Sequence, residues 1–242
     1  MTDVQKLQAF LECVRYAEDQ HGEGPKKIGK VPFITISRET GAGGHTLASS
    51  ILNEMREHTD PAFEGWHMCD QELCKMVADE PGLKVTMKNL LASEYRPVME
   101  DFLEQLIVGV TPQDAVVKKM FEIIRQLALL GKVILVGHGG ASLTRDLPGG
   151  IHLRLVASLP NRVRRMGKLL GISEARAREE VLEQDKGRAK LVKTFFNRDI
   201  HDPLLYDIVW NTDRVSVEEI ARLVLQLVKV RAAESLKACK CS

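Results

Sequence analysis

A short turn rich in small residues, Thr40-Gly41-Ala42-Gly43-Gly44, stands between an apolar stretch and a helical pattern. The apolar, β-branched residues 31–36 are typical of a buried strand in a parallel sheet, and from about Gly44 apolar residues recur every four positions. Glycines in such a turn let backbone N–H groups approach an anion, and a helix start adds unpaired donors and partial positive charge. The turn alone is equally compatible with a phosphate-binding loop and with a tight bend that needs small residues.

The turn departs from both standard nucleotide-binding sequences. The P-loop template G-x-x-x-x-G-K-[ST] has a Lys before its hydroxyl residue, and Gly44 stands where that Lys belongs. Thr46, two places later, still supplies a hydroxyl for Mg²⁺. A Rossmann fingerprint would need a third glycine where Thr46 stands. Arg38 and Glu39 lie inside the predicted loop, where an acid would repel phosphate. Either a cation pairs with Glu39 or the two side chains form a structural arrangement without a ligand.

Length and composition indicate an ordinary globular protein. The chain has 242 residues, enough for one large domain or one domain with an inserted lid, and its net charge is +1. We therefore expect no nucleic-acid partner, and because no apolar run approaches about 18 residues, no membrane partner. The N-terminus lacks a secretory pattern, and the cysteines number five, an odd count. These features favour a reducing, cytoplasmic setting.

Strand and helix patterns alternate along the chain. An amphipathic helix over 4–16 is followed by a Gly/Lys/Pro linker to about residue 30. The alternation predicts an α/β domain with a mainly parallel sheet covered on both faces, and ligands bind such sheets at the carboxyl ends of the strands. Beyond the first strand we expect strands at 65–69, 132–136, 151–156 and 206–210, and helices at 71–78, 98–108, 113–130, 160–171, 173–193 and 216–233.

Basic residues are concentrated between Arg154 and Arg198. This segment holds twelve Lys or Arg against five acids. In an α/β protein with a phosphate turn, an arginine-rich helical segment predicts a lid that clamps a polyanionic substrate and excludes water. The alternative for most of these residues is a solvated helix face.

Four motifs in order resemble the cytidylate-kinase-like family, a divergent branch of the P-loop nucleoside monophosphate kinases. They are ITISRETGAGGHTLA, CDQEL, VILVGHGGASLTRDLPGGIHLRLVA and EEVLEQDKGRAKLVKTFFNRDIHDPLLYDIVWNT, within residues 31–228. The resemblance implies a P-loop NTPase-like three-layer α/β fold with a five-stranded, mainly parallel sheet and arginine-rich lid helices. It divides the chain into an N-terminal helix and linker (1–30), a kinase-like domain (31–233) and a flexible tail (234–242). Within the domain, the acceptor-binding insertion covers about 66–110 and the lid about 172–200.

The resemblance also implies a set of site residues, carried over by position. Catalytic residues would be Arg38, Asp185 and Arg188, with Arg188 steadying the transferring phosphoryl group. The ATP phosphates would contact Ser37, Arg38, Gly41, Ala42, Gly43, Gly44, His45 and Thr46, and Thr46 would face Mg²⁺. The acceptor nucleotide would contact Asp70, Gly137, His138, Gly139 and Arg198. From the residues alone, Asp70 is equally well explained as a helix N-cap, and Asp185 with Arg188 as an ordinary i, i+3 pair.

Two departures from the family pattern leave two functions open. Gly44 replaces the P-loop Lys, and His138 replaces the Arg of a second glycine turn that usually reads G-R-G. The first function is Mg²⁺-dependent phosphoryl transfer from ATP to a nucleoside monophosphate, with CMP or dCMP as the acceptor implied by resemblance and Arg38 compensating for the lost Lys. The second is a catalytically weak or silent nucleotide sensor that signals through the N-terminal helix, which also offers a surface for homo-oligomerisation.

Overall fold

The computed structural model describes the backbone of residues 31–69 and 112–240. The expected N-terminal helix, the expected helices at 71–78 and 98–108, most of the acceptor-binding insertion, and Asp70 lie outside these residues. Within them, no helix is long and apolar enough to cross a membrane.

Five parallel strands form one sheet, and the glycine turn follows its central strand. The strands are β1 (Phe33–Arg38), β2 (His67–Cys69), β3 (Val133–Val136), β4 (Gly150–Val156) and β5 (Ile208–Asn211). Their order is β2-β3-β1-β4-β5, and each neighbouring pair is parallel. In this order, β1 and β3 bring the carboxyl ends of two strands, each followed by a glycine turn, to the same edge of the sheet.

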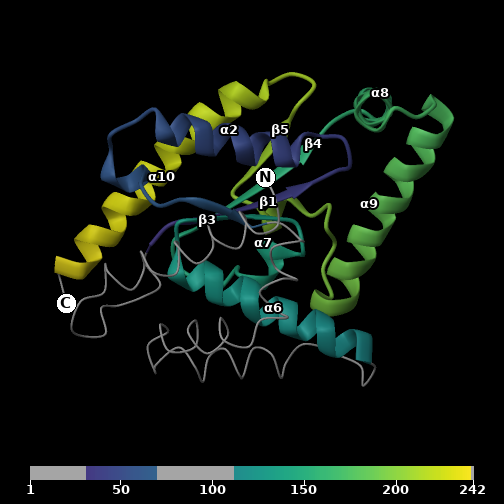
Figure 1. Ribbon diagram of the computed structural model, residues 1–242. Helices are drawn as coiled ribbons and strands as arrows, with labels where there is room; N and C mark the ends of the chain where they lie inside the picture. Colours follow the sequence, from purple (N-terminus) through teal and green to yellow (C-terminus); the bar gives the residue numbers. More distant parts are fainter. Residues whose placement is uncertain (1–30, 70–111, 241–242) are drawn as a thin grey trace.

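Helices cover both faces of the sheet, as Figure 1 shows. The helices α2 (Gly44–Arg56) and α10 (Val217–Lys240) pack together on one face, beside the short turn η1 (Pro61–Phe63). On the other face lie α6 (Pro112–Leu130) and the short α7 (Gly140–Leu143). Two further helices, α8 (Leu159–Leu170) and α9 (Glu174–Phe196), extend to one side, and the turn η2 (Pro203–Leu205) leads into β5. This is the predicted three-layer α/β fold.

The main core joins the sheet to α2 and α10. Leu47 and Ile51 of α2 are fully buried against Ile34 and Ile36 of β1, and Val224 of α10 completes the same cluster. Because α2 is clamped in this way, its first turn and the glycine turn before it have a fixed position at the end of β1.

Local signals in the sequence set several helix ends. Ser173 begins α9, where its hydroxyl accepts from the Arg176 N–H, and Gly171 ends α8 in a left-handed conformation at φ 66°. Ser216 and Glu219 form the predicted capping box of α10. Residues at these positions predicted the boundaries to within one or two residues.

Among the differences from the sequence-based expectation, two concern the ends of elements and one concerns a short helix. β1 runs to Arg38 rather than ending near residue 36, because pairing with β4 continues through Ser37 and Arg38, so both are strand residues and not loop residues. α10 continues to Lys240 beyond the expected end near Ala233, since no Gly or Pro interrupts 234–240. α7 was not expected, because four residues are too few to show a helical period.

Candidate functional site

Two cavities lie near the glycine turn. The larger, of about 770 Å³, opens at the carboxyl ends of β1 and β3; its lining includes Ser37, Arg38, the segment 137–142, Arg188 of α9 and Tyr206. The smaller, of about 570 Å³, is lined by Ala42, Gly43 and Thr46 of the turn and α2, together with Arg165 and the segment 212–217. The turn residues Ala42 and Gly43 line the smaller cavity, and Ser37 and Arg38, which precede the turn, line the larger one.

Glycine is required at two positions of the turn. Gly41 has φ +81°, and a Cβ there would lie 2.6 Å from the carbonyl oxygen of Arg162. Gly43 has φ +93° and is the residue before α2, whose Leu47 N–H donates to its carbonyl. The close approach at Gly41 and the positive φ of both residues explain the small residues structurally, and Gly43 and Thr46 place the start of α2 at the smaller cavity.

Arg38 occupies the space that the missing Lys would use. Its Cγ and Cδ lie 2.9 and 3.1 Å from where a Cβ on Gly44 would be, and its Nη1 lies 2.1 Å from the corresponding point on Gly137. Among the described residues, the Arg38 guanidinium has no hydrogen-bond or ion-pair partner. Burial, together with nearby Arg188, lowers the pKa of Arg38 to about 10, and Asp185 opposes this change. A half-buried cation without a partner is the feature of this site that most calls for an anionic ligand.

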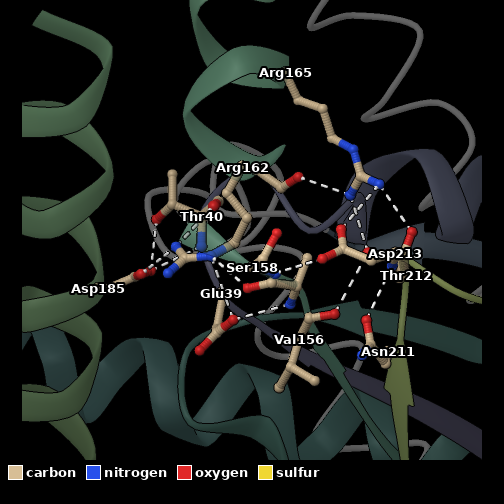
Figure 2. A network of polar contacts seen from close by, with 12 residues as sticks. Glu39, Thr40, Val156, Ser158, Arg162, Arg165, Asp185, Asn211, Thr212 and Asp213 are labelled. Carbon is tan, nitrogen blue, oxygen red and sulfur yellow. Dashed lines mark hydrogen bonds and ion pairs between the residues drawn. The ribbon is translucent and has the colours of Figure 1, made fainter. Parts of the chain in front are cut away.

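Glu39, the acid inside the expected loop, forms an ion pair with an arginine. Its Oε2 accepts from the Ala157 N–H at 3.0 Å and lies 3.3 Å from Nε of Arg162 in α8, as Figure 2 shows. Arg162 is buried and donates further to the carbonyls of Ala157 and Thr40. Glu39 therefore ties α8 to the turn, and its charge is neutralised before any phosphate approaches.

Asp185 of α9 is joined to the turn on the side of the larger cavity. Its Oδ1 accepts from the backbone N–H and the hydroxyl of Thr40, both at 2.7 Å, and its Oδ2 accepts from Arg162 at 2.6 Å (Figure 2). Arg188 donates to the Thr40 hydroxyl and to Asp185 Oδ1, the latter at 3.2 Å, so the i, i+3 pair is present but also reaches beyond its own helix. Burial is the main cause that lowers the pKa of Arg188. Two of the three expected catalytic residues thus meet at the turn, with Arg38 facing them.

A second cluster lies on the floor of the larger cavity. Arg154 of β4 is 3% exposed and donates to the Ser37 hydroxyl at 2.9 Å; its other terminal nitrogen lies 3.4 Å from Nδ1 of His201. The Ser37 hydroxyl lies 3.2 Å from the Tyr206 hydroxyl, whose proton goes to the carbonyl of Ile200 at 2.9 Å. Arg154 also lies over the ring of Tyr206.

The remaining expected residues fall into three groups. Gly137, His138 and Gly139 line the larger cavity with φ of 93°, 54° and 67°, so His138 adopts the left-handed conformation although it is not glycine. His45 and Thr46 are exposed on the first turn of α2, and Thr46 lines the smaller cavity. Arg198 follows the end of α9 and lines neither cavity.

The smaller cavity has a rigid rim. Arg165 of α8 donates to the hydroxyl and carbonyl of Thr212, at 3.0 and 2.8 Å, and lies 3.7 Å from Asp213 (Figure 2). Asp213 accepts from the Ser158 N–H at 2.7 Å, and contacts with Ser158 lower the pKa of that carboxyl. These contacts fix the segment after β5 against α8.

Sequence reasoning missed two arginines that organise the site, Arg154 and Arg162. Both were counted in the basic segment but not singled out. Arg154 carried a usable signal, since it is a charge inside the otherwise strand-like run Gly150–Val156. Arg162 is one of several basic residues on α8, and only tertiary contact distinguishes it from its exposed neighbours.

Comparison with known proteins gives a consistent result. The model of the cytidylate kinase-like family matches residues 33–214. Curated relatives include the cytidylate kinase of Pyrobaculum aerophilum, 29% identical over 63% of this chain and 83% of that protein, and the cytidylate kinase of Methanocaldococcus jannaschii, 23% identical over 79% and 94%. The chain spans less than two thirds of two others, 18% of a uronate isomerase from Corynebacterium glutamicum and 63% of a cytidylate kinase from Sulfurisphaera tokodaii.

A solved structure supports the fold. The crystal structure of an uncharacterized protein from Eubacterium ventriosum aligns with a TM-score of 0.62 at 20% identity, covering 83% of this chain and 99% of that one.

Proposed function

This chain belongs to the cytidylate kinase-like family, and we propose that it transfers the γ-phosphoryl group of ATP to a nucleoside monophosphate, with CMP or dCMP as the acceptor. The observation that carries the proposal is the pair of cavities that adjoin the glycine turn and the strand end before it, with Arg38, whose guanidinium has no partner among the described residues, lining the larger one. Transfer between two nucleotides requires two binding spaces and a shared phosphate site between them.

The two spaces suit different substrates. We assign ATP to the smaller cavity, where the N–H groups at the start of α2 face the phosphates and the segment 212–217 borders the nucleoside. The acceptor takes the larger cavity, which is lined by the second glycine turn and α9. The helices α8 and α9 act as the lid predicted from the basic segment.

Arg38 supports catalysis in place of the P-loop Lys. Its aliphatic stem lies against Gly44 and its guanidinium against Gly137, close enough to Arg188 that this second cation disfavours the charge of Arg38. A transferring phosphoryl group would relieve this repulsion, because charge spreads over its oxygens in the transition state. Phosphoryl transfer needs positioning and electrostatic stabilisation rather than a protein nucleophile, and the residues around the turn can provide both.

Magnesium would arrive with the nucleotide. Among the described residues, no cluster of three or more His, Cys, Asp or Glu could hold a metal ion, whereas the exposed hydroxyl of Thr46 fits a single protein ligand to a phosphate-bound ion. Mg²⁺ in kinase sites takes few protein ligands and several phosphate and water oxygens. Its contribution would be to neutralise charge on the β- and γ-phosphates.

Transfer of label from γ-labelled ATP tests the proposal. The purified protein is incubated with Mg²⁺ and a panel of nucleoside monophosphates, together with Arg188→Ala and, as a matched control, Arg176→Ala. Arg176 lies on the same helix, is exposed and pairs only with Glu179 and Glu180 in the described chain. We expect labelled CDP or dCDP from the wild type and the control, and at least about 10²-fold less from Arg188→Ala.

The alternative, a nucleotide sensor, gives a different result. If ATP raises the melting temperature but no acceptor is labelled, the kinase proposal is wrong and the sensor is favoured by Gly44 and His138. If ATP neither reacts nor binds, the glycine turn is only a structural turn.

A further inference from the structure

Polar side chains form a stripe on one face of the two central strands. On β1, Thr35 and Ser37 alternate with the buried Ile34 and Ile36, which contact the α2 side of the core. On β4, the partners of Thr35 and Ser37 in the strand register are His152 and Arg154. Thr35 is hydrogen-bonded to His152 at 2.8 Å and Ser37 to Arg154 at 2.9 Å, so the stripe consists of two cross-strand pairs.

Arg154 differs from the other buried arginines. Arg125 is paired with Asp146 at 2.5 Å, and Arg162 with Asp185 and Glu39. Within residues 31–69 and 112–240, no carboxylate lies at ion-pair distance from Arg154, whose hydrogen-bond partners are a hydroxyl and an imidazole. Burying a charge is costly unless an opposite charge compensates, and Arg side chains are rarely fully buried without a partner. Within the described residues, Arg154 is therefore a buried cation without an anionic partner.

The hydroxyl of Ser37 is oriented by this arrangement. Ser37 Oγ accepts from Arg154, and Tyr206 uses its own proton on the Ile200 carbonyl. The Ser37 proton therefore points away from Arg154, toward the Tyr206 oxygen at 3.2 Å or toward the larger cavity that both residues line. An anion in that cavity would receive a hydrogen bond strengthened by the guanidinium behind it.

We infer that Ser37, with Arg154 behind it, forms an anion subsite in the floor of the larger cavity that receives the 5′-phosphate of the acceptor nucleotide. The inference rests on the proposed function in taking that cavity as the acceptor site. Ser37 is the residue that touches the phosphate; Arg154, at 3% exposure, is a positioning residue that acts through it. The guanidinium of Arg154 gives the subsite a permanent positive charge.

Paired titrations of a nucleotide and its nucleoside test the subsite without any turnover. Isothermal titration calorimetry measures the affinity of the full chain for CMP and cytidine, and for AMP and adenosine. The ratio of the two affinities isolates the contribution of the phosphate. We expect Ser37→Ala to lower the affinity for the monophosphates about tenfold, the usual effect of losing a hydrogen bond to a charged group. The affinity for the nucleosides should be unchanged.

Arg154 is tested against a matched arginine. Arg154→Gln should lower the monophosphate-to-nucleoside ratio at least as much as Ser37→Ala, and Arg154→Lys should restore part of it. Arg125→Gln removes an equally buried arginine that donates to Leu143 and Asp146, whereas Arg154 donates to Ser37 of the larger cavity, and it should leave the ratio unchanged. Combining Ser37→Ala with Arg154→Gln should add little, because both act through one hydrogen bond.

Each outcome decides the inference. If Arg154→Gln does not fold, Ser37→Ala alone decides it. A ratio unchanged in Ser37→Ala, or a wild type that binds CMP no tighter than cytidine, refutes the subsite and leaves Arg154 a structural residue. A phosphate preference that Ser37→Ala abolishes, in a protein that labels no acceptor, supports the subsite while the proposed function fails.

Discussion

Adding one methyl group at Gly44 should separate activity from stability. A Cβ at this position would lie 2.9 and 3.1 Å from Cγ and Cδ of Arg38, where real Cβ contacts are almost never closer than about 3.0 Å and seldom closer than about 3.4 Å. The Arg38 side chain must therefore shift by roughly half an ångström at its root, and on the order of 1 Å at its guanidinium. Because a 1 Å misplacement in an active site can cost about 10²-fold in rate, we expect Gly44→Ala to lower kcat by about that factor.

The same substitution should cost little stability. Gly44 is not among the glycines with positive φ, so alanine fits its backbone, and the obstructing atoms belong to a flexible side chain. Alanine is also favoured over glycine in a helix by up to about 1 kcal/mol. We expect the melting temperature of Gly44→Ala to match that of Ser49→Ala, an exposed control on the same helix, in which kcat should be unchanged.

A complementary assay transfers the positive charge from position 38 to position 44. Arg38→Ala removes the obstruction, so a Lys at position 44 then fits, and the double variant Arg38→Ala/Gly44→Lys should recover part of the phosphoryl transfer that Arg38→Ala loses. Steady-state transfer of label from γ-labelled ATP measures all four variants. Wild-type kcat in both Gly44→Ala and Arg38→Ala would refute the assignment of Arg38 as the replacement for the P-loop Lys.

Three further perturbations follow from the site. Burial lowers the pKa of Arg38 to about 10, so its charge is disfavoured in the free protein, and calorimetry of Arg38→Met should show a melting temperature roughly 2–4 °C higher as transfer is lost. Burial also lowers the pKa of His152; the unfolded chain then binds a proton below about pH 6.5 that the folded chain resists. The free energy of unfolding should therefore decrease as the pH is lowered from 7 to 5. In His152→Gln, urea titrations at pH 7 and pH 5 should show a smaller decrease. Asp185→Asn keeps an acceptor for Thr40 but leaves Arg162 less well compensated, which should cost about 2 kcal/mol of stability and speed hydrogen exchange of the Thr40 amide.

Sequence periodicity was sufficient for the layered α/β fold because the strands and the longer helices of the described residues carried local signals, whereas α7 is too short to show one. β-branched runs predicted the strands of the sheet, and Ser173, Gly171 and Ser216 marked helix ends by the hydrogen bonds and backbone conformations that these residue types favour. The end of β1 was not predictable in this way. Ser37 and Arg38 are polar, and only their pairing with Arg154 and Leu155 of β4 keeps them in the strand.

The site was predictable in its elements but not in its contacts. The glycine turn, Asp185 and Arg188 were found from motif and resemblance, whereas the partner of Glu39 could not be, because Arg162 is more than a hundred residues away in the chain. For the same reason, the sequence shows that Thr35 and Ser37 alternate with apolar residues on β1, but only the pairing of β1 with β4 identifies the residues that they contact.

The absence of the P-loop Lys is best understood together with the presence of Arg38. Arg38 passes over Gly44 and ends against Gly137, at distances that exclude a Cβ on either residue. A Lys at position 44 and an Arg at position 38 in this conformation are therefore mutually exclusive. Under the proposed function, the departure from the template at Gly44 would be one half of a pair: the cation would enter the site from the end of β1 instead of the start of α2, and the absence of a Cβ at Gly44 and Gly137 leaves room for it.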